Sequence, residues 1–127
     1  MFTKKEMWPV MLTPFTERGE VDYNALERLI AFYEEGGCSG LFAICQSSEV
    51  FYLSLEERVK IADFVKKHAH VPVIASGGAG GVQDFVDLFR EIPDMSAGLA
   101  ASIFHFGEVA IPDLKQVLRE NGVCVRL

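Results

Sequence analysis

Two short loops carry residues suited to binding an anion. The first is Gly77-Gly78-Ala79-Gly80, and the second is Ala101-Ser102. Glycines let backbone N–H groups converge on an anion without obstruction by Cβ atoms, and Ser102 adds a hydroxyl donor. A helical turn near residues 103–107 would point its positive dipole end at the same place. We predict a phosphate or sulfate site at Gly77, Gly78, Ala101 and Ser102; the alternative is a tight strand-to-helix turn.

Histidines and cysteines offer little further chemistry. His105 lies between Phe104 and Phe106, where it is a general base or, more commonly, a structural hydrogen-bonded side chain. The three cysteines, Cys38, Cys45 and Cys124, are odd in number and have no CxxC spacing. This pattern predicts buried, reduced thiols. No His, Cys and carboxylate set has metal-ligand spacing, so we expect no metal and no cofactor.

Composition excludes several classes of partner. The 127 residues are 50% hydrophobic and 24% charged, as in a folded globular chain, and the net charge is −6. A negative chain is a poor match for nucleic acid or an anionic membrane. The apolar runs are too short to span a bilayer, and the polar, mixed-charge residues 1–6 do not resemble a signal peptide. We therefore expect a soluble, cytoplasmic protein.

The same order of elements repeats four times along the chain. Each repeat is an apolar run, then a loop, then an amphipathic helix that begins at a capping signal such as Asp22 or the Ser54-Leu55-Glu56-Glu57 capping box. We predict strands over 8–15, 40–45, 71–76 and 97–104, helices over 23–35, 55–68 and 82–92, and a fourth helix from Pro112 to Asn121-Gly122. In the third helix, Phe85, Leu88, Phe89 and Ile92 form the core stripe.

This alternation predicts an α/β fold with a parallel sheet and right-handed crossovers. A small open sheet of the flavodoxin type is one solution. The other is half of a TIM (β/α)8 barrel, which normally needs about 250 residues. We favour a single (βα)4 half-barrel domain over residues 1–127 that pairs with a second copy as a homodimer. The open edges should then place Trp8, Met11, Phe104 and Leu118 near the interface.

The first part of the chain, about 7–76, resembles the N-terminus of the dihydrodipicolinate synthase and N-acetylneuraminate lyase family of class I aldolases. The resemblance rests on the order and spacing of Thr13-Pro14-Phe15, Gly19-Glu20-Val21-Asp22, Gly40-Leu41-Phe42, Cys45-Gln46-Ser47-Ser48-Glu49 and Leu53-Ser54-Leu55-Glu56-Glu57-Arg58. It implies the first two βα units of a barrel.

The second part, about 73–127, is similar to the C-terminal quarter of the cyclase subunit of imidazole glycerol phosphate synthase. The matching residues are Ile74 to Gly80, Leu99 to Phe106, and Gly122 to Leu127. It implies the last two βα units of another barrel, with phosphate held by the loops after its strands. We interpret the chain as an engineered chimera of a 1–72 and a 73–127 segment, with a natural recombinant as the alternative.

The resemblances imply that catalytic residues of both families are absent. The aldolases form a Schiff base through a lysine on a later strand, and the cyclase uses two aspartates on earlier strands. The carboxylate-binding loop of the aldolase family is replaced here by Cys45 to Glu49. Ser47 and Ser48 could still bind a carboxylate; the alternative is an ordinary polar loop. We expect a scaffold without evolved catalysis; the alternatives are a phosphate or sugar-phosphate binding module and a residual lyase acting on a keto acid.

Overall fold

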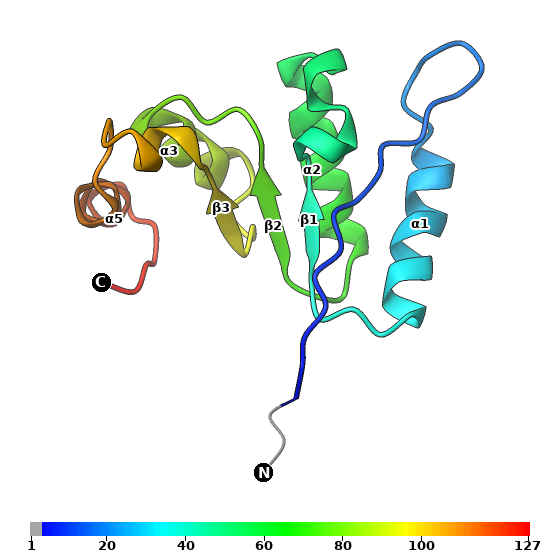
Figure 1. Cartoon of the computed structure of the whole chain (residues 1–127), viewed down its shortest axis with the longest axis horizontal. Helices are drawn as coiled ribbons and strands as arrows, with labels where there is room; N and C mark the ends of the chain where they lie inside the picture. Colours follow the sequence, from blue (N-terminus) through cyan, green and yellow to red (C-terminus); the bar gives the residue numbers. More distant parts are fainter. Residues whose placement is uncertain (1–3) are drawn as a thin grey trace.

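The computed structural model describes residues 4–127, which form a parallel sheet with helices packed on it (Figure 1). The sheet has three strands, β1 (Leu41–Ala43), β2 (Val73–Ser76) and β3 (Ala97–Leu99), in the order β1-β2-β3. The α-helices are α1 (Tyr23–Glu35), α2 (Leu55–His68), α3 (Val82–Glu91), α4 (Ser102–His105) and α5 (Ile111–Glu120), and two short 3-10 helices are η1 (Gln46–Ser48) and η2 (Val50–Tyr52).

The segment predicted as the first strand lies beside β1 but forms only one bridge to it. Val10 pairs in parallel with Phe42, and the Met11 N–H donates to the Phe42 carbonyl. Proline at 9 and 14 removes two of the N–H donors that a regular ladder needs. The prediction of a full strand over 8–15 is therefore wrong, although this segment does occupy the position of a first strand.

The order of these segments selects a barrel over a flavodoxin-like sheet. The 8–15 segment, β1, β2 and β3 lie side by side in the order in which they occur along the chain. A flavodoxin-type sheet instead places its second strand outside its first. Sequential parallel strands with helical crossovers are the arrangement of a (β/α)8 barrel. The predicted fold class, half of a TIM barrel, is thus confirmed.

The helix predictions hold because their signals are local. The bounds of α1 are as predicted, and the Asp22 carboxylate accepts from the Ala25 N–H at 2.9 Å as an N-cap. The capping box at α2 is present, with Ser54 and Glu57 each bonded to the other's backbone N–H. In α3, Phe85 and Ile92 are buried and Leu88 and Phe89 are half-buried, so the stripe is also correct.

Two predicted strands end earlier than expected. β1 stops at Ala43 because Ile44 adopts a left-handed conformation with φ of 57°, which ends the ladder. β3 stops at Leu99, and the chain enters helix α4 at Ser102, so residues 102–104 are helical and not extended. The helical turn predicted over 103–107 is therefore present, but in the structure it begins at Ser102, one residue earlier than predicted.

The buried side chains form two separate clusters. The larger one packs strands β1 and β2 against α1 and α2, and it contains Met11, Leu26, Ile30 and Val65 among others. The smaller one packs α3 against α5, around Phe85, Val86, Leu114 and Leu118. The helices cover the sheet face that carries Ala75 and Gly98, because a Cβ on Gly98 would lie 3.0 Å from Leu88 and Phe85. In Figure 1, α2 lies behind β1.

An acidic side chain joins α1 to the segment that leads into β2. Glu34 accepts from the His70 N–H at 2.6 Å, and its second oxygen lies 3.0 Å from His70 Nδ1. Partial burial acts to raise the pKa of Glu34, but the hydrogen bonds from His70 together outweigh it and hold that pKa below its ordinary value. The ionised carboxylate is therefore the form that the folded chain favours.

Replacing Glu34 with Gln should make the stability of the chain less sensitive to acid. Since the pKa is lowered in the folded state, the contribution of Glu34 is present at neutral pH and is lost as pH falls through that lowered pKa. We expect Glu34→Gln to lower the free energy of unfolding by up to about 1 kcal/mol at neutral pH and by less in acid. Urea unfolding at several pH values measures it, with the exposed Glu35→Gln as control; a difference that stays constant across pH would contradict the account.

Candidate anion-binding rim

The two predicted anion loops leave neighbouring strands at the same end of the sheet. Ser76, the last residue of β2, pairs in register with Leu99, the last residue of β3. The β2–α3 loop therefore starts beside the β3–α4 loop. The carboxyl ends of barrel strands are where barrel enzymes place their sites. The structure thus brings Gly77 and Gly78 to the same rim as Ala101 and Ser102.

Gly77 and Gly78 are in conformations that other residues rarely adopt. Their φ angles are 95° and 105°, in the left-handed region. A Cβ on Gly77 would lie 2.8 Å from the Ile44 carbonyl oxygen, and one on Gly78 would lie 3.1 Å from Nη1 of Arg58. Both glycines are therefore required by the backbone, which is also what a tight strand-to-helix turn demands.

The later part of the glycine-rich loop is already engaged within the chain. The Gly80 and Gly81 N–H groups donate to Asp84 Oδ2 at 2.7 and 3.0 Å. This carboxylate caps the start of α3 and occupies the position that a bound anion would take at these two amides. The Gly80 and Gly81 amides are thus engaged within the chain, and Gly77 and Gly78, the loop residues of the predicted site, precede them.

Ala101 and Ser102 lie at the start of a single helical turn. Ala101 is the N-cap of α4, and its carbonyl accepts from the His105 N–H at 2.9 Å. Ser102 is the first residue of the turn, where backbone N–H groups have no partner inside the helix. Both residues are exposed. That the backbone N–H groups and the Ser102 hydroxyl at this turn donate to a bound anion stays a prediction.

Arg58 adds a cation that sequence reasoning did not connect with this loop. It lies in the first turns of α2, and its Nε donates to the Leu53 carbonyl at 3.0 Å, which fixes the side chain. Its Nη1 then lies against Gly78. Arg58 and Gly78 are separated by a helix and a strand, so the local sequence pattern holds no signal of their contact.

The second predicted polar loop is held together by Ser48. This side chain is 1% exposed, its hydroxyl donates to the Met11 carbonyl, and its Oγ accepts from the Cys45 N–H at 3.0 Å. Thr13 Oγ1 donates to the Ser48 carbonyl at 2.6 Å. The hydroxyl of Ser48 is thus engaged inside the chain, and the predicted carboxylate site rests on the exposed Ser47.

The remaining candidate side chains are placed as follows. His105 is exposed and packs edge-on against Phe106 at a centroid distance of 5.0 Å. Burial raises the pKa of the Cys45 thiol, although a hydrogen bond with Ser76 opposes the shift, and burial also raises the pKa of Cys38. Cys38 and Cys45 are half-buried and Cys124 is exposed, so the prediction of three buried thiols is wrong for Cys124 and holds only in part for the other two.

Residues 4–127 contain neither a metal-ligand cluster nor a membrane-spanning helix. Within that range, no group of three or more His, Cys, Asp and Glu side chains is arranged to hold a metal ion. Nor does that range contain a helix that combines the length and the apolar character needed to cross a membrane.

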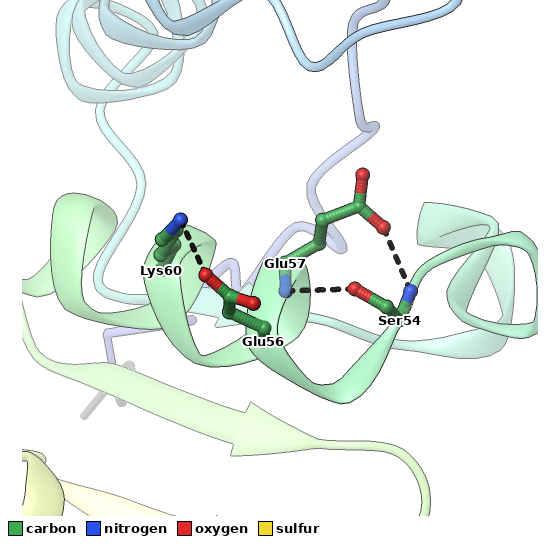
Figure 2. A network of polar contacts seen from close by, with 4 residues as sticks. All are labelled: Ser54, Glu56, Glu57 and Lys60. Atoms are coloured by element: carbon green, nitrogen blue, oxygen red, sulfur yellow. Dashed lines mark hydrogen bonds and ion pairs between the residues drawn. The ribbon is translucent and has the colours of Figure 1, made fainter.

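The charged residues at the start of α2 are explained by capping and pairing. Figure 2 shows Glu57 and Ser54 in the capping box and Glu56 beside Lys60. The Lys60 Nζ lies 2.7 Å from Glu56 Oε1. This ion pair raises the pKa of Lys60 and lowers that of Glu56, so the lysine stays protonated. The sequence interpretation of these acids as helix-capping groups agrees with this geometry.

The fold and the placement of the rim define a fragment of a parallel α/β barrel. The chain belongs to the dihydrodipicolinate synthetase family, whose family model matches residues 3–103. A crystal structure of dihydrodipicolinate synthase is 33% identical, with a TM-score of 0.63, over 74% of this chain and 33% of that one. The synthase from Acinetobacter baumannii, at 23% identity and a TM-score of 0.68, shares the fold over 98% of this chain and 44% of that one.

The chain is also similar to a second barrel family. Imidazole glycerol phosphate synthase subunit HisF from Leuconostoc mesenteroides is 51% identical over 69 residues, which are 54% of this chain and 27% of that protein. The subunit from Lactiplantibacillus plantarum is 60% identical over 57 residues, 45% of this chain and 22% of the relative. The chain therefore spans about a quarter of these relatives, and both predicted resemblances are confirmed.

Removing the Ser48 hydroxyl should loosen the contact between η1 and the first segment. Ser48→Ala leaves the buried Met11 carbonyl and Cys45 N–H without this partner, which typically costs about 1–3 kcal/mol. We expect that loss in the free energy of unfolding, measured with urea. The neighbouring exposed Ser47→Ala is the matched control and should stay within about 0.5 kcal/mol of the wild type. Equal effects of the two substitutions would refute the role given to Ser48.

Proposed function

We propose that this chain is a half-barrel scaffold that is completed by a second copy of itself. The observation that carries the proposal is the apolar sheet face opposite the helices. Register places Val10, Phe42, Ile74 and Ala97 in one row across that face. In a closed barrel this row would be interior and covered by side chains from the other strands. A second half is the occupant that would bury it.

The edges of the half-barrel support the same partner. Beside the first segment and α1 lies a groove of about 490 Å³, whose wall includes Leu12, Pro14, Leu29 and Phe32. Phe32 is 67% exposed and Leu12 is 58% exposed. A neighbouring barrel helix would cover such a groove. Met11 and Leu118 are buried inside the chain and Trp8 and Phe104 are half-buried, so the expectation that these four residues lie near an interface stays a prediction.

The origin that best accounts for two family resemblances in one chain is an engineered chimera. The segment predicted from the cyclase family is 73–127, and the matches to HisF proteins cover 57 and 69 residues. The dihydrodipicolinate synthetase match extends to residue 103, past the joint predicted in the third strand near residues 72–76. Both families are barrels, so a shared strand-helix order accounts for this overlap. A natural recombination would give the same sequence pattern.

The lysines favour a scaffold over a lyase. A Schiff-base lysine must approach its substrate as a free amine at the rim. Here Lys60, Lys66 and Lys67 lie on α2, Lys115 lies on α5, and Lys4 and Lys5 precede the first paired segment. Lys60 and Lys67 form ion pairs with Glu56 and Asp63. The activity of the complete relatives is therefore not part of what we propose for this chain.

A charge on the uncovered face should separate the two copies. Val10→Lys puts an ammonium in the row that a second half would bury, and we expect dissociation to rise by at least about tenfold, since a buried unpaired charge is costly. Sedimentation velocity over a concentration series measures this. Phe51→Lys, on an exposed side chain of η2, is the matched control and should not change the mass. Identical behaviour of both variants would reject this face as the interface.

A second candidate function is binding of phosphate or sulfate at the rim. It is favoured by the paired loops, by the left-handed Gly77 and Gly78, and by the nearby Arg58 guanidinium. Backbone N–H groups in such turns can form an anion-binding concavity, and a fixed cation strengthens it. Asp84 at the adjacent amides limits the site to a small anion. This function is compatible with the scaffold and does not require catalysis.

Inorganic phosphate should shift the amide resonances of Gly77, Gly78, Ala101 and Ser102 in an NMR titration to millimolar concentration. Gly78→Ala should abolish the shifts, because its φ of 105° strains any other residue and its Cβ would meet Arg58. Gly19→Ala is the matched control: its φ is 80°, it faces open space, and it should leave phosphate binding unchanged. If those four amides do not move in the wild type, the anion site is wrong.

A further inference from the structure

We propose that the groove between α2 and α3 binds a small apolar monocarboxylate. The groove has a volume of about 630 Å³, within the range of ligand pockets. Its apolar lining comes from both helices and from the strands between them, and includes Leu55, Val59, Ala62, Ala75, Phe85 and Leu88. This site is distinct from the uncovered sheet face and does not depend on pairing with a second copy.

The groove follows the boundary between the two buried clusters. Ala62 belongs to the cluster around α1 and α2, and Phe85 belongs to the cluster around α3 and α5. Small residues form the floor, because Ala75 and Gly98 are paired across β2 and β3 on the helix-covered face. The two clusters meet at α3, where Phe89 is partly buried against both, and the apolar groove follows the boundary between them. An apolar ligand body would fill it and contact both clusters.

Arg58 supplies the charge that selects an anionic head group. It lines the groove at the Gly78 end, and its Nε bond to the Leu53 carbonyl leaves the two terminal nitrogens to donate. Over residues 4–127, no carboxylate lies within ion-pair distance of Arg58. A guanidinium end with its terminal N–H groups free matches a carboxylate in a two-bond arrangement.

The acids around the groove favour a single negative charge on the ligand. Glu56 pairs with Lys60, Asp84 accepts from two loop amides, and Asp87 accepts from Gln83 and Arg90. Glu91 ends α3 at the far end, about 14 Å along the helix from its first residue. These acids lie along the groove, so a second negative charge on the body of the ligand, away from Arg58, would be repelled.

Isothermal titration with decanoate, below the concentration at which it self-associates, tests the proposal. Decanoate should bind and shift amides of α2 and α3, and decan-1-ol should bind more weakly. Arg58→Gln should weaken decanoate binding by about 10- to 100-fold and leave decanol binding unchanged. Arg119→Gln, an exposed arginine of α5 outside the groove, is the matched control and should bind like the wild type.

Two groove variants keep the test independent of any one side chain. Val59→Trp should fill the groove and abolish binding of both probes, and Leu55→Asp should place a competing carboxylate near Arg58 and weaken decanoate alone. Equal affinity for decanoate and decanol, shifts centred on Phe42 and Ile74, or unchanged binding by Val59→Trp with a native spectrum would each overturn the proposal. Because a monomer contains the whole groove, failure of pairing leaves these outcomes unaffected.

Discussion

The structure depends on β2, which forms a parallel ladder with β1 on one side and with β3 on the other. Val73 to Ala75 pair with β1, and Ile74 to Ser76 pair with β3. This strand lies where the two family resemblances meet, so its backbone hydrogen bonds join the segments in one sheet. The pairing needs only the correct register of a short parallel strand, which many barrel sequences supply. The side chains that cover the sheet divide into two buried clusters, which meet at Phe89 of α3, and the groove between α2 and α3 lies along their boundary.

Much of the fold could be predicted because its signals are local. Asp22 and the Ser54–Glu57 pair begin α1 and α2 through bonds within four residues, and Gly36 follows the last residue of α1. The ends of the strands were harder to predict from the sequence. Ile44 leaves the β region despite its β-branched side chain, a conformation that only tertiary packing explains. The prolines at 9 and 14 limit the first strand, and their effect on its pairing could have been anticipated.

The candidate site was predictable in part. The glycines at 77 and 78 indicated a tight turn after the strand. The alternation of strands and helices placed this turn beside the loop of Ala101 and Ser102. Arg58 could not be assigned to this rim, because most of α2 and all of β2 separate it from Gly78 in the sequence and only the fold brings the two together. Ser48 shows the opposite difficulty: a serine in a polar loop suggests a ligand donor, yet its buried hydroxyl bonds to Met11, a contact between residues 37 positions apart. The residue type indicated a group that needs a hydrogen-bond partner, and only the fold determined which partner it has.

The central claim is that this half-barrel covers its apolar face with a second copy. Sedimentation equilibrium of the wild-type chain tests it most directly, since it reports mass without reference to shape. The account predicts a mass approaching twice the 14.1 kDa of one chain as concentration rises, with dissociation on dilution. A mass of one chain at every concentration would contradict it.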